Sequence, residues 1–197
     1  MNDLAVALHA DWLSDAAARI RQPRLRESFA NDARMRVRVA ARLAAEQGLP
    51  DAETHGLNAA SRQILAAFSQ DSARLVTLTG LVWNARFLAR MVTRDAVTPV
   101  LGQIDRKDLI FALKLREFAP AEASFGYEAG KLRDFIETAG LRCVLSWLKS
   151  LPPGLAGRLR MSLPRVLSFA DEAASLPPAI CADILVLAAR NFTSREV

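Results

Sequence analysis

The chain has 197 residues, of which 51% are apolar, and its formal net charge is +5. This length allows one domain with a sizeable core or two small helical lobes. No uncharged stretch approaches the roughly 20 residues that a membrane-spanning helix needs, and acidic and histidine side chains interrupt the apolar N-terminal run. We therefore expect a folded cytoplasmic protein with no signal peptide and no transmembrane segment.

Apolar residues recur at helical spacing from end to end, and strand-like alternation lasts for only a few positions at a time. The sequence therefore predicts an all-α protein, either one compact multi-helix domain over residues 1–197 or two small helical lobes. In the first half, helices are expected over about 3–20, 24–47, 59–69 and 72–93. The helix over 72–93 is apolar nearly all round, so we expect it to be central and buried.

The second half of the chain contains further helical segments, expected over about 106–118, 128–150, 154–161, 165–173 and 179–191. Asp105 is a good N-cap for the first of these, and Pro120 ends it. Residues 120–127 form a linker in this interpretation. The linker is either a boundary between two lobes or a tight loop inside one domain.

The residue chemistry shows no catalytic signature. His9 and His55 are far apart in the sequence, and neither has a neighbour at metal-ligand spacing. Motifs for zinc or for nucleotide phosphates do not occur, and nucleophilic catalysis by serine or cysteine needs a histidine base. Cys143 and Cys181 each lie in an apolar helical run, as expected for free, buried thiols in a reducing compartment. We expect no enzyme, no cofactor and no metal.

Arginine is the dominant cation, and it is concentrated between Arg19 and Arg42. Helical spacing of four places three of these arginines in one row: Arg34, Arg38 and Arg42. Met35, Val39 and Leu43 form a neighbouring row that would face the core. Three interpretations stay open, namely a solvated helix face, a basic ridge for an acidic protein partner, and a basic ridge for nucleic acid. Interleaved aromatic residues, which would support binding of single strands, are absent apart from Phe29.

Two more groups are candidates for partner binding. Trp83 has Asn84 and Arg86 beside it, and tryptophan with arginine is a common hot-spot combination, although core packing is the alternative for this indole. The helix over 106–118 carries its cations on its polar side, and a plain amphipathic surface helix is the alternative there. The candidate partner-binding residues are Trp83, Arg86, Arg90, Arg106, Lys107, Lys114, Arg34, Arg38 and Arg42.

Three segments between residues 55 and 165 carry a resemblance to a known family. The first is His55-Gly56-Leu57; the second is Gly80-Leu81-Val82 with Leu88-Ala89-Arg90 and the amphipathic segment 101–118; the third is Ser146-Trp147-Leu148 with the segment 158–164. In this order and spacing the chain resembles the SctK family (YscK and PscK), the cytosolic adaptor of the type III secretion sorting platform. The resemblance does not extend to the first fifty residues.

This resemblance implies a non-enzymatic adaptor in the cytoplasm, peripheral to the bacterial inner membrane at the injectisome. The implied partners are the pod protein (SctQ) and the cytoplasmic domain of the inner-membrane ring protein (SctD), with no cofactor and no small-molecule substrate. The alternative is a helical nucleic-acid-binding module that uses the basic ridge from Arg19 to Arg42. A secretion chaperone would be an acidic dimer, and the isoelectric point of about 9.9 argues against it.

Overall fold

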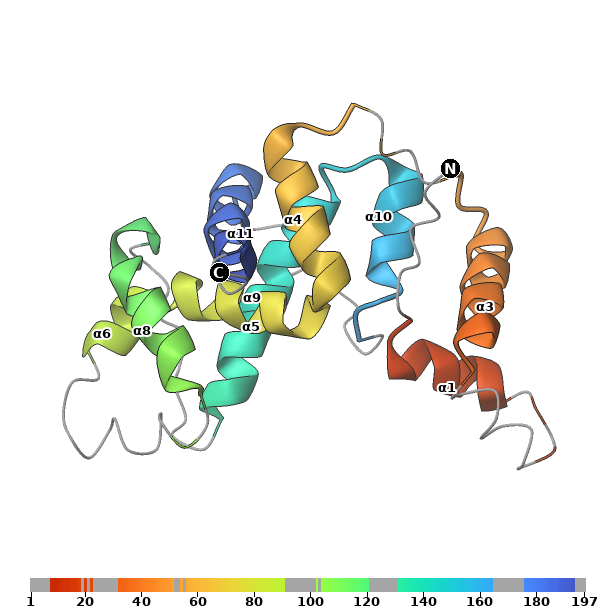
Figure 1. The fold of residues 1–197 in the computed structure, drawn as a ribbon, viewed down its shortest axis with the longest axis horizontal. Helices are drawn as coiled ribbons and strands as arrows, with labels where there is room; N and C mark the ends of the chain where they lie inside the picture. Colours follow the sequence, from red (N-terminus) through yellow and green to blue (C-terminus); the bar gives the residue numbers. More distant parts are fainter. Residues whose placement is uncertain are drawn as a thin grey trace. The chain divides into compact units, whose positions relative to one another are not determined.

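The computed structural model describes residues 8–18, 20, 22, 32–51, 54, 56–90, 102, 104–120, 131–164 and 176–193 (Figure 1). These residues form α-helices and one 3-10 turn and contain no strand, so the all-α prediction is confirmed. Within the same ranges, none of the helices combines the length and the apolar character needed to cross a bilayer.

The chain divides into two compact units, which are described separately. The first unit comprises Met1–Leu57 and Leu148–Asp171, and the second comprises Asn58–Trp147 and Glu172–Val197. The chain therefore passes from one unit to the other after Leu57, after Trp147 and after Asp171. The lobe boundary expected near 120–127 is not one of these passages, and residues 121–130 lie outside the described part of the chain.

The first unit contains α1 (Ala10–Ala18), α3 (Ala33–Glu46) and α10 (Pro153–Arg160). Its core consists of Leu8, Leu13, Val39, Ala44 and Met161. The N-terminal end of α1 is tied to the segment after α10, because the backbone N–H of His9 donates to the Met161 carbonyl at 3.0 Å. The indole Nε1 of Trp12 donates to the Leu163 carbonyl, also at 3.0 Å.

Two glycines of α10 lie close to the loop that follows α3. A methyl group on Gly154 would lie 2.5 Å from the carbonyl oxygens of Pro50 and Asp51, which is closer than such contacts permit. On Gly157 it would lie 2.6 Å from the end of the Leu49 side chain. The glycines of α10 therefore let its backbone approach this loop.

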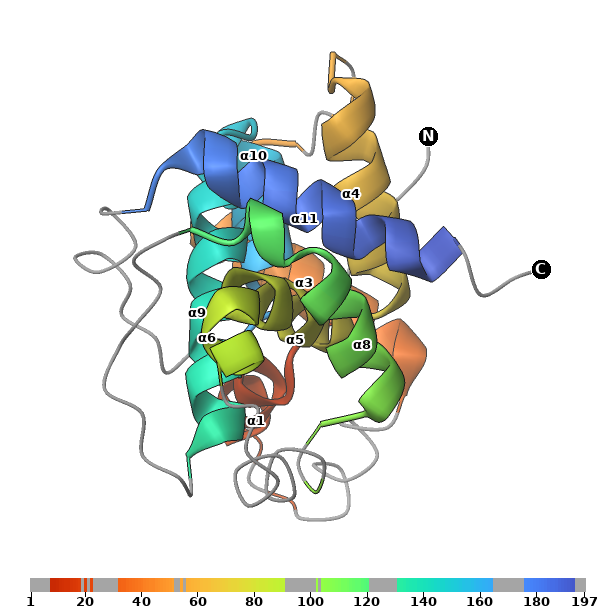
Figure 2. The ribbon, with the colours of Figure 1, turned by 90° about the vertical axis from the view of Figure 1, so that its left-hand side faces the viewer.

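The second unit contains the remaining elements (Figures 1 and 2). They are α4 (Ala59–Gln70), α5 (Ser72–Trp83), α6 (Ala85–Arg90), α8 (Arg106–Lys114), the 3-10 turn η1 (Arg116–Phe118), α9 (Leu132–Leu148) and α11 (Pro178–Thr193). Helix α11 packs along α4 and α5, and α8 packs against α5 and α6. As expected, α5 is central, with eight of its residues buried from Leu75 to Trp83.

A close helix crossing in the second unit joins α5 to α9. A methyl group on Gly80 would overlap the backbone carbonyl of Ile136, and one on Gly140 would overlap the backbone carbonyl of Val76. Neither glycine has a positive φ, so both are needed for space and not for an unusual backbone conformation. Aromatic contacts flank the crossing, with the rings of Phe68 and Trp147 6.4 Å apart between centroids.

Side-chain caps define where several helices begin. Asp105 accepts a hydrogen bond from the backbone N–H of Lys107 at 2.7 Å, which confirms its predicted role as the N-cap of α8. Asp71 caps α5 in the same way through the N–H of Arg74 at 2.9 Å. Asn58 caps α4 through Ser61 at 2.7 Å, so α4 starts where the sequence predicted.

The long helix expected over 72–93 is interrupted in the structure. Helix α5 ends at Trp83, and α6 begins at Ala85. Asn84 stands between them, and the Gly80 carbonyl accepts both its backbone N–H at 3.1 Å and its side-chain amide at 2.9 Å. Similarly, the helix expected over 106–118 changes after Lys114 into a 3-10 turn.

Other expected helices are described only in part. The structure places 10–18, 33–46 and 132–148 in helices within the ranges expected over 3–20, 24–47 and 128–150. The helix expected over 165–173 lies entirely outside the described residues, as do residues 91–93 at the end of the range 72–93.

We predict that Gly80→Ala and Gly140→Ala each lower the free energy of unfolding by about 1–3 kcal/mol or more, because the added methyl group meets backbone atoms that cannot rotate away. Alanine is otherwise the better helix former by about 1 kcal/mol, so helix propensity alone predicts the opposite sign. Urea unfolding followed by circular dichroism measures the change.

Gly157→Ala is the matched comparison, because its methyl group would meet only the flexible end of the Leu49 side chain. We expect a smaller loss for this variant. If Gly80→Ala proved as stable as the unmodified protein, the close crossing of α5 and α9 would be wrong.

Candidate functional site

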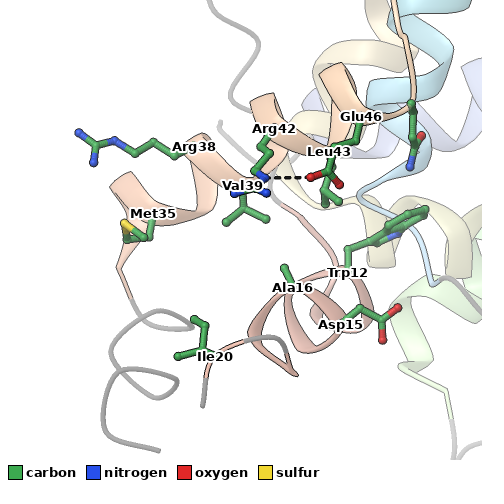
Figure 3. A pocket seen from close by; sticks show the side chains of 11 residues that line it. Trp12, Asp15, Ala16, Ile20, Met35, Arg38, Val39, Arg42, Leu43 and Glu46 are labelled. Carbon is green, nitrogen blue, oxygen red and sulfur yellow. Dashed lines mark hydrogen bonds and ion pairs between the residues drawn. The ribbon is translucent and has the colours of Figure 1, made fainter. Parts of the chain in front are cut away.

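A groove lies between α1 and α3 in the first unit (Figure 3). Its volume is about 730 Å³. The apolar part of its lining consists of Trp12, Ala16, Ile20, Met35, Val39 and Leu43. Polar side chains complete the lining at Asp15, Arg38, Arg42, Glu46 and Gln47. The neighbouring row expected to face the core therefore lines the groove: Val39 is buried, and Met35 and Leu43 are half-buried.

The arginine row of α3 lies along this groove. Arg34, Arg38 and Arg42 are all exposed, and the last two line the groove directly. The Nε atom of Arg42 donates to Glu46 at 2.8 Å, although the arginine side chain is 78% exposed. Among the residues that the structure describes, no carboxylate pairs with the guanidinium of Arg34 or Arg38. Two cations of the row are therefore available to a partner.

A second surface is formed by α8 and η1 in the second unit. Ile110 is 45% exposed and Phe118 is 49% exposed, which is unusual for large apolar side chains. A shallow groove beside them is lined by Ile110, Leu113, Lys114, Arg116 and Glu117. Arg106 and Lys107 are exposed on the first turn of α8. Exposed apolar side chains thus lie among cations on this surface, which we call the α8–η1 surface.

Arg86 supports the α8–η1 surface from α6. Its Nε donates to the Arg116 carbonyl and its Nη2 donates to the Glu117 carbonyl, both at 3.2 Å. These two hydrogen bonds hold the 3-10 turn, so the side chain fixes the surface and does not reach out from it. Arg90 is the last residue of α6 and is exposed.

Trp83 does not belong to either surface. The side chain is 6% exposed and lies in the core cluster with Leu109, Leu132 and Cys181. The neighbouring Asn84 suggested a surface position, but Asn84 is itself completely buried and bonds within its own turn. Core packing, the alternative interpretation of this indole, is therefore the correct one.

Arg74 has a role that the sequence did not indicate. Its guanidinium donates to Asp108 at 3.3 Å and lies over the Phe192 ring, 5.3 Å from the centroid. The contacts join α5 to α8 and α11. Partners separated by 34 residues and more in sequence leave no local pattern, so only the three-dimensional structure could identify them.

The two cysteines are free and buried, as predicted. Both side chains are completely shielded from solvent. Burial raises the pKa of the Cys143 thiol well above its usual range, and a hydrogen bond to Cys181 raises this pKa further. A neutral, buried thiol is a poor nucleophile, so Cys143 acts as a core side chain.

Comparison with protein-family models, with curated proteins and with solved structures gives no match. Within the described ranges, histidine, cysteine, aspartate and glutamate side chains do not gather in groups of three or more that could hold a metal ion. The groove between α1 and α3 and the α8–η1 surface are therefore the features on which a functional proposal can draw.

We predict that Trp83→Ala lowers the free energy of unfolding by about 3–5 kcal/mol, because it leaves a cavity in the core cluster. Phe118→Ala is the matched control, since that ring is half exposed; its cost should stay near about 0.5 kcal/mol. Urea unfolding followed by circular dichroism distinguishes the two. If both variants lost equally little stability, Trp83 would lie at the surface and not in the core.

Proposed function

We propose that this chain is a non-enzymatic adaptor of a type III secretion sorting platform, which links the inner-membrane ring protein to the pod protein. In this proposal the chain works in the cytoplasm at the inner-membrane face, without a cofactor or small-molecule substrate. Binding would come from helical surfaces, and no chemical step would take place.

The observation that carries the adaptor part of the proposal is that each unit has a surface of its own that combines cations with accessible apolar side chains. In the first unit, Arg34 and Arg38 lie beside the groove between α1 and α3. In the second unit, Lys114 and Arg116 lie beside Ile110. Charged residues around an apolar centre are typical of protein interfaces, and an adaptor needs at least two of them.

The secretion part of the proposal is supported by the resemblance to the SctK family. Its matching segments include Gly80, at the crossing of α5 and α9, and Trp147, which is buried beside Phe68. These residues form the core of the second unit, so a shared order of such segments is what a shared helical framework would produce. The surfaces that meet partners would be free to differ.

Nucleic-acid binding is the second candidate, and the exposed row of Arg34, Arg38 and Arg42 favours it. One cation of the row, Arg42, already pairs with Glu46 inside the groove, so few cations are left for a run of phosphates. The affinity of a protein for a phosphate backbone depends on cations that neutralise the phosphates, and the lining of this groove is largely apolar. A protein partner suits this surface better.

We predict that the tagged chain, purified at moderate salt with nuclease from the bacterium that encodes it, retains a pod protein and an inner-membrane ring protein. Lys114→Glu combined with Arg116→Glu should reduce the recovery of one of them by about tenfold, because two cations of the α8–η1 surface are reversed. Quantitative mass spectrometry of the retained proteins measures both results.

The matched control is Arg62→Glu combined with Lys149→Glu, which makes the same charge change at exposed positions outside both surfaces. This control should retain both partners. Recovery of neither partner with the unmodified chain would refute the secretion assignment. Recovery of DNA-associated proteins that disappear on nuclease treatment would favour the nucleic-acid candidate instead.

A further inference from the structure

We propose that the groove between α1 and α3 binds an acidic amphipathic helix of a protein partner. The inference rests on the proposed function only in taking this chain to be a protein-binding adaptor. It does not depend on which assembly the adaptor serves.

Both walls of the groove are held in place within the first unit. Helix α1 is fixed by the hydrogen bonds from His9 to Met161 and from Trp12 to Leu163, each 3.0 Å long. Helix α3 contributes Ala44 to the same core as Met161 and packs against α10. The groove is therefore formed before any partner arrives, which reduces the entropy lost on binding.

The lining of the groove suits apolar side chains. Ala16 points across the groove toward Val39, and Trp12 and Leu43 lie beside them (Figure 3). A volume of about 730 Å³ lies within the range of roughly 300–1,000 Å³ in which proteins bury organic ligands. It can accept several apolar side chains from one face of a helix.

The geometry of the walls selects a helix over an extended peptide. Both walls are helices, whose backbone N–H and C=O groups bond within the helix except in the first and last turns. An added β-strand needs an exposed sheet edge to hydrogen-bond with, and none borders this groove in the described residues. A helix needs no such edge, because it places side chains at i, i+3, i+4 and i+7 into an apolar groove.

The charge of α3 selects an acidic partner. The helix carries Arg34, Arg36, Arg38 and Arg42 but only one acidic residue, Glu46. Arg34 and Arg38 are four residues apart and have no carboxylate partner among the described residues. Glutamates four apart on a partner helix would present carboxylates at the same spacing, and arginine binds carboxylates through two parallel hydrogen bonds.

The test begins with a display library of helical peptides of about 18 residues, or five turns. Apolar positions at helical spacing carry Leu, Ile, Val or Phe, and the polar positions are randomised among Glu, Gln and Lys. Selection on the full-length protein should enrich Glu at pairs of positions four apart. The strongest selected peptide is then labelled, and its affinity is measured by fluorescence anisotropy.

Two independent variants test where the peptide binds. Ala16→Trp fills the groove without changing its charge and should weaken binding by about tenfold or more, the effect of losing roughly 1.4 kcal/mol. Arg34→Glu combined with Arg38→Glu alters only exposed side chains and should weaken binding similarly, with a larger effect at low salt. The second variant keeps the test valid if the first fails to fold.

The matched controls are Ala41→Trp, on an exposed position of α3 outside the groove, and Arg62→Glu, on an exposed position of α4. Both should bind the peptide as the unmodified protein does. Four results would overturn the proposal: no enrichment of any peptide, enrichment of Lys or Gln, binding that Ala16→Trp leaves unchanged, and displacement of the peptide by duplex DNA. A dimer that Ala16→Trp dissociates would overturn it too, because a second copy would then fill the groove.

The peptide-binding experiment tests the groove, whereas the co-purification tests the secretion assignment, so either result can be negative without the other. Loss of peptide binding would leave partner recovery through the α8–η1 surface intact, because that surface lies in the other unit. Conversely, failure to recover a pod or ring protein would refute the secretion assignment, whereas the selected peptide would still report on the groove.

Discussion

The close approach of α5 and α9 at Gly80 and Gly140 is the contact on which the second unit depends. Because neither glycine has a side chain, the two backbones meet directly, and the residues on both sides of the crossing are drawn together. The tilted rings of Phe87 and Phe135 lie 5.9 Å apart between centroids, and the side chain of Cys143 interacts with that of Cys181. Any larger residue at the crossing would separate the helices and open this core.

The α8–η1 surface follows from that core through two arginines. Arg74 projects from α5 and pairs with Asp108 of α8, while Arg86 projects from α6 and holds the carbonyls of η1. Hydrogen bonds to charged groups contribute about 1.5–3 kcal/mol each. The exposed side chains of Ile110 and Phe118 are therefore presented by a fixed framework, and not by a surface that must first fold around its partner.

Local patterns in the sequence were sufficient for several of the helices but not for the surfaces. Apolar spacing identified α4 and α11 to within a residue or two, and Asp105 was recognisable as a cap because capping is decided by neighbours. Trp83 was misassigned to a partner surface because burial depends on α8 and α9, which are distant in sequence. The groove between α1 and α3 could not be predicted from the sequence either, because its lining comes from two helices and local spacing does not encode how they pack.

The arginines differ in the same way: some form tertiary contacts, whereas those of α3 are exposed. Arg74 and Arg86 are engaged in tertiary contacts, so their positions have a structural reason within this fold. Arg34 and Arg38 form no such contact among the described residues and stand four apart, where like charges destabilise a helix by about 0.2–0.5 kcal/mol per pair. A row that weakens its own helix is not explained by folding stability. Carboxylates of a bound partner would remove this repulsion, so binding and helix stability would favour the same arrangement.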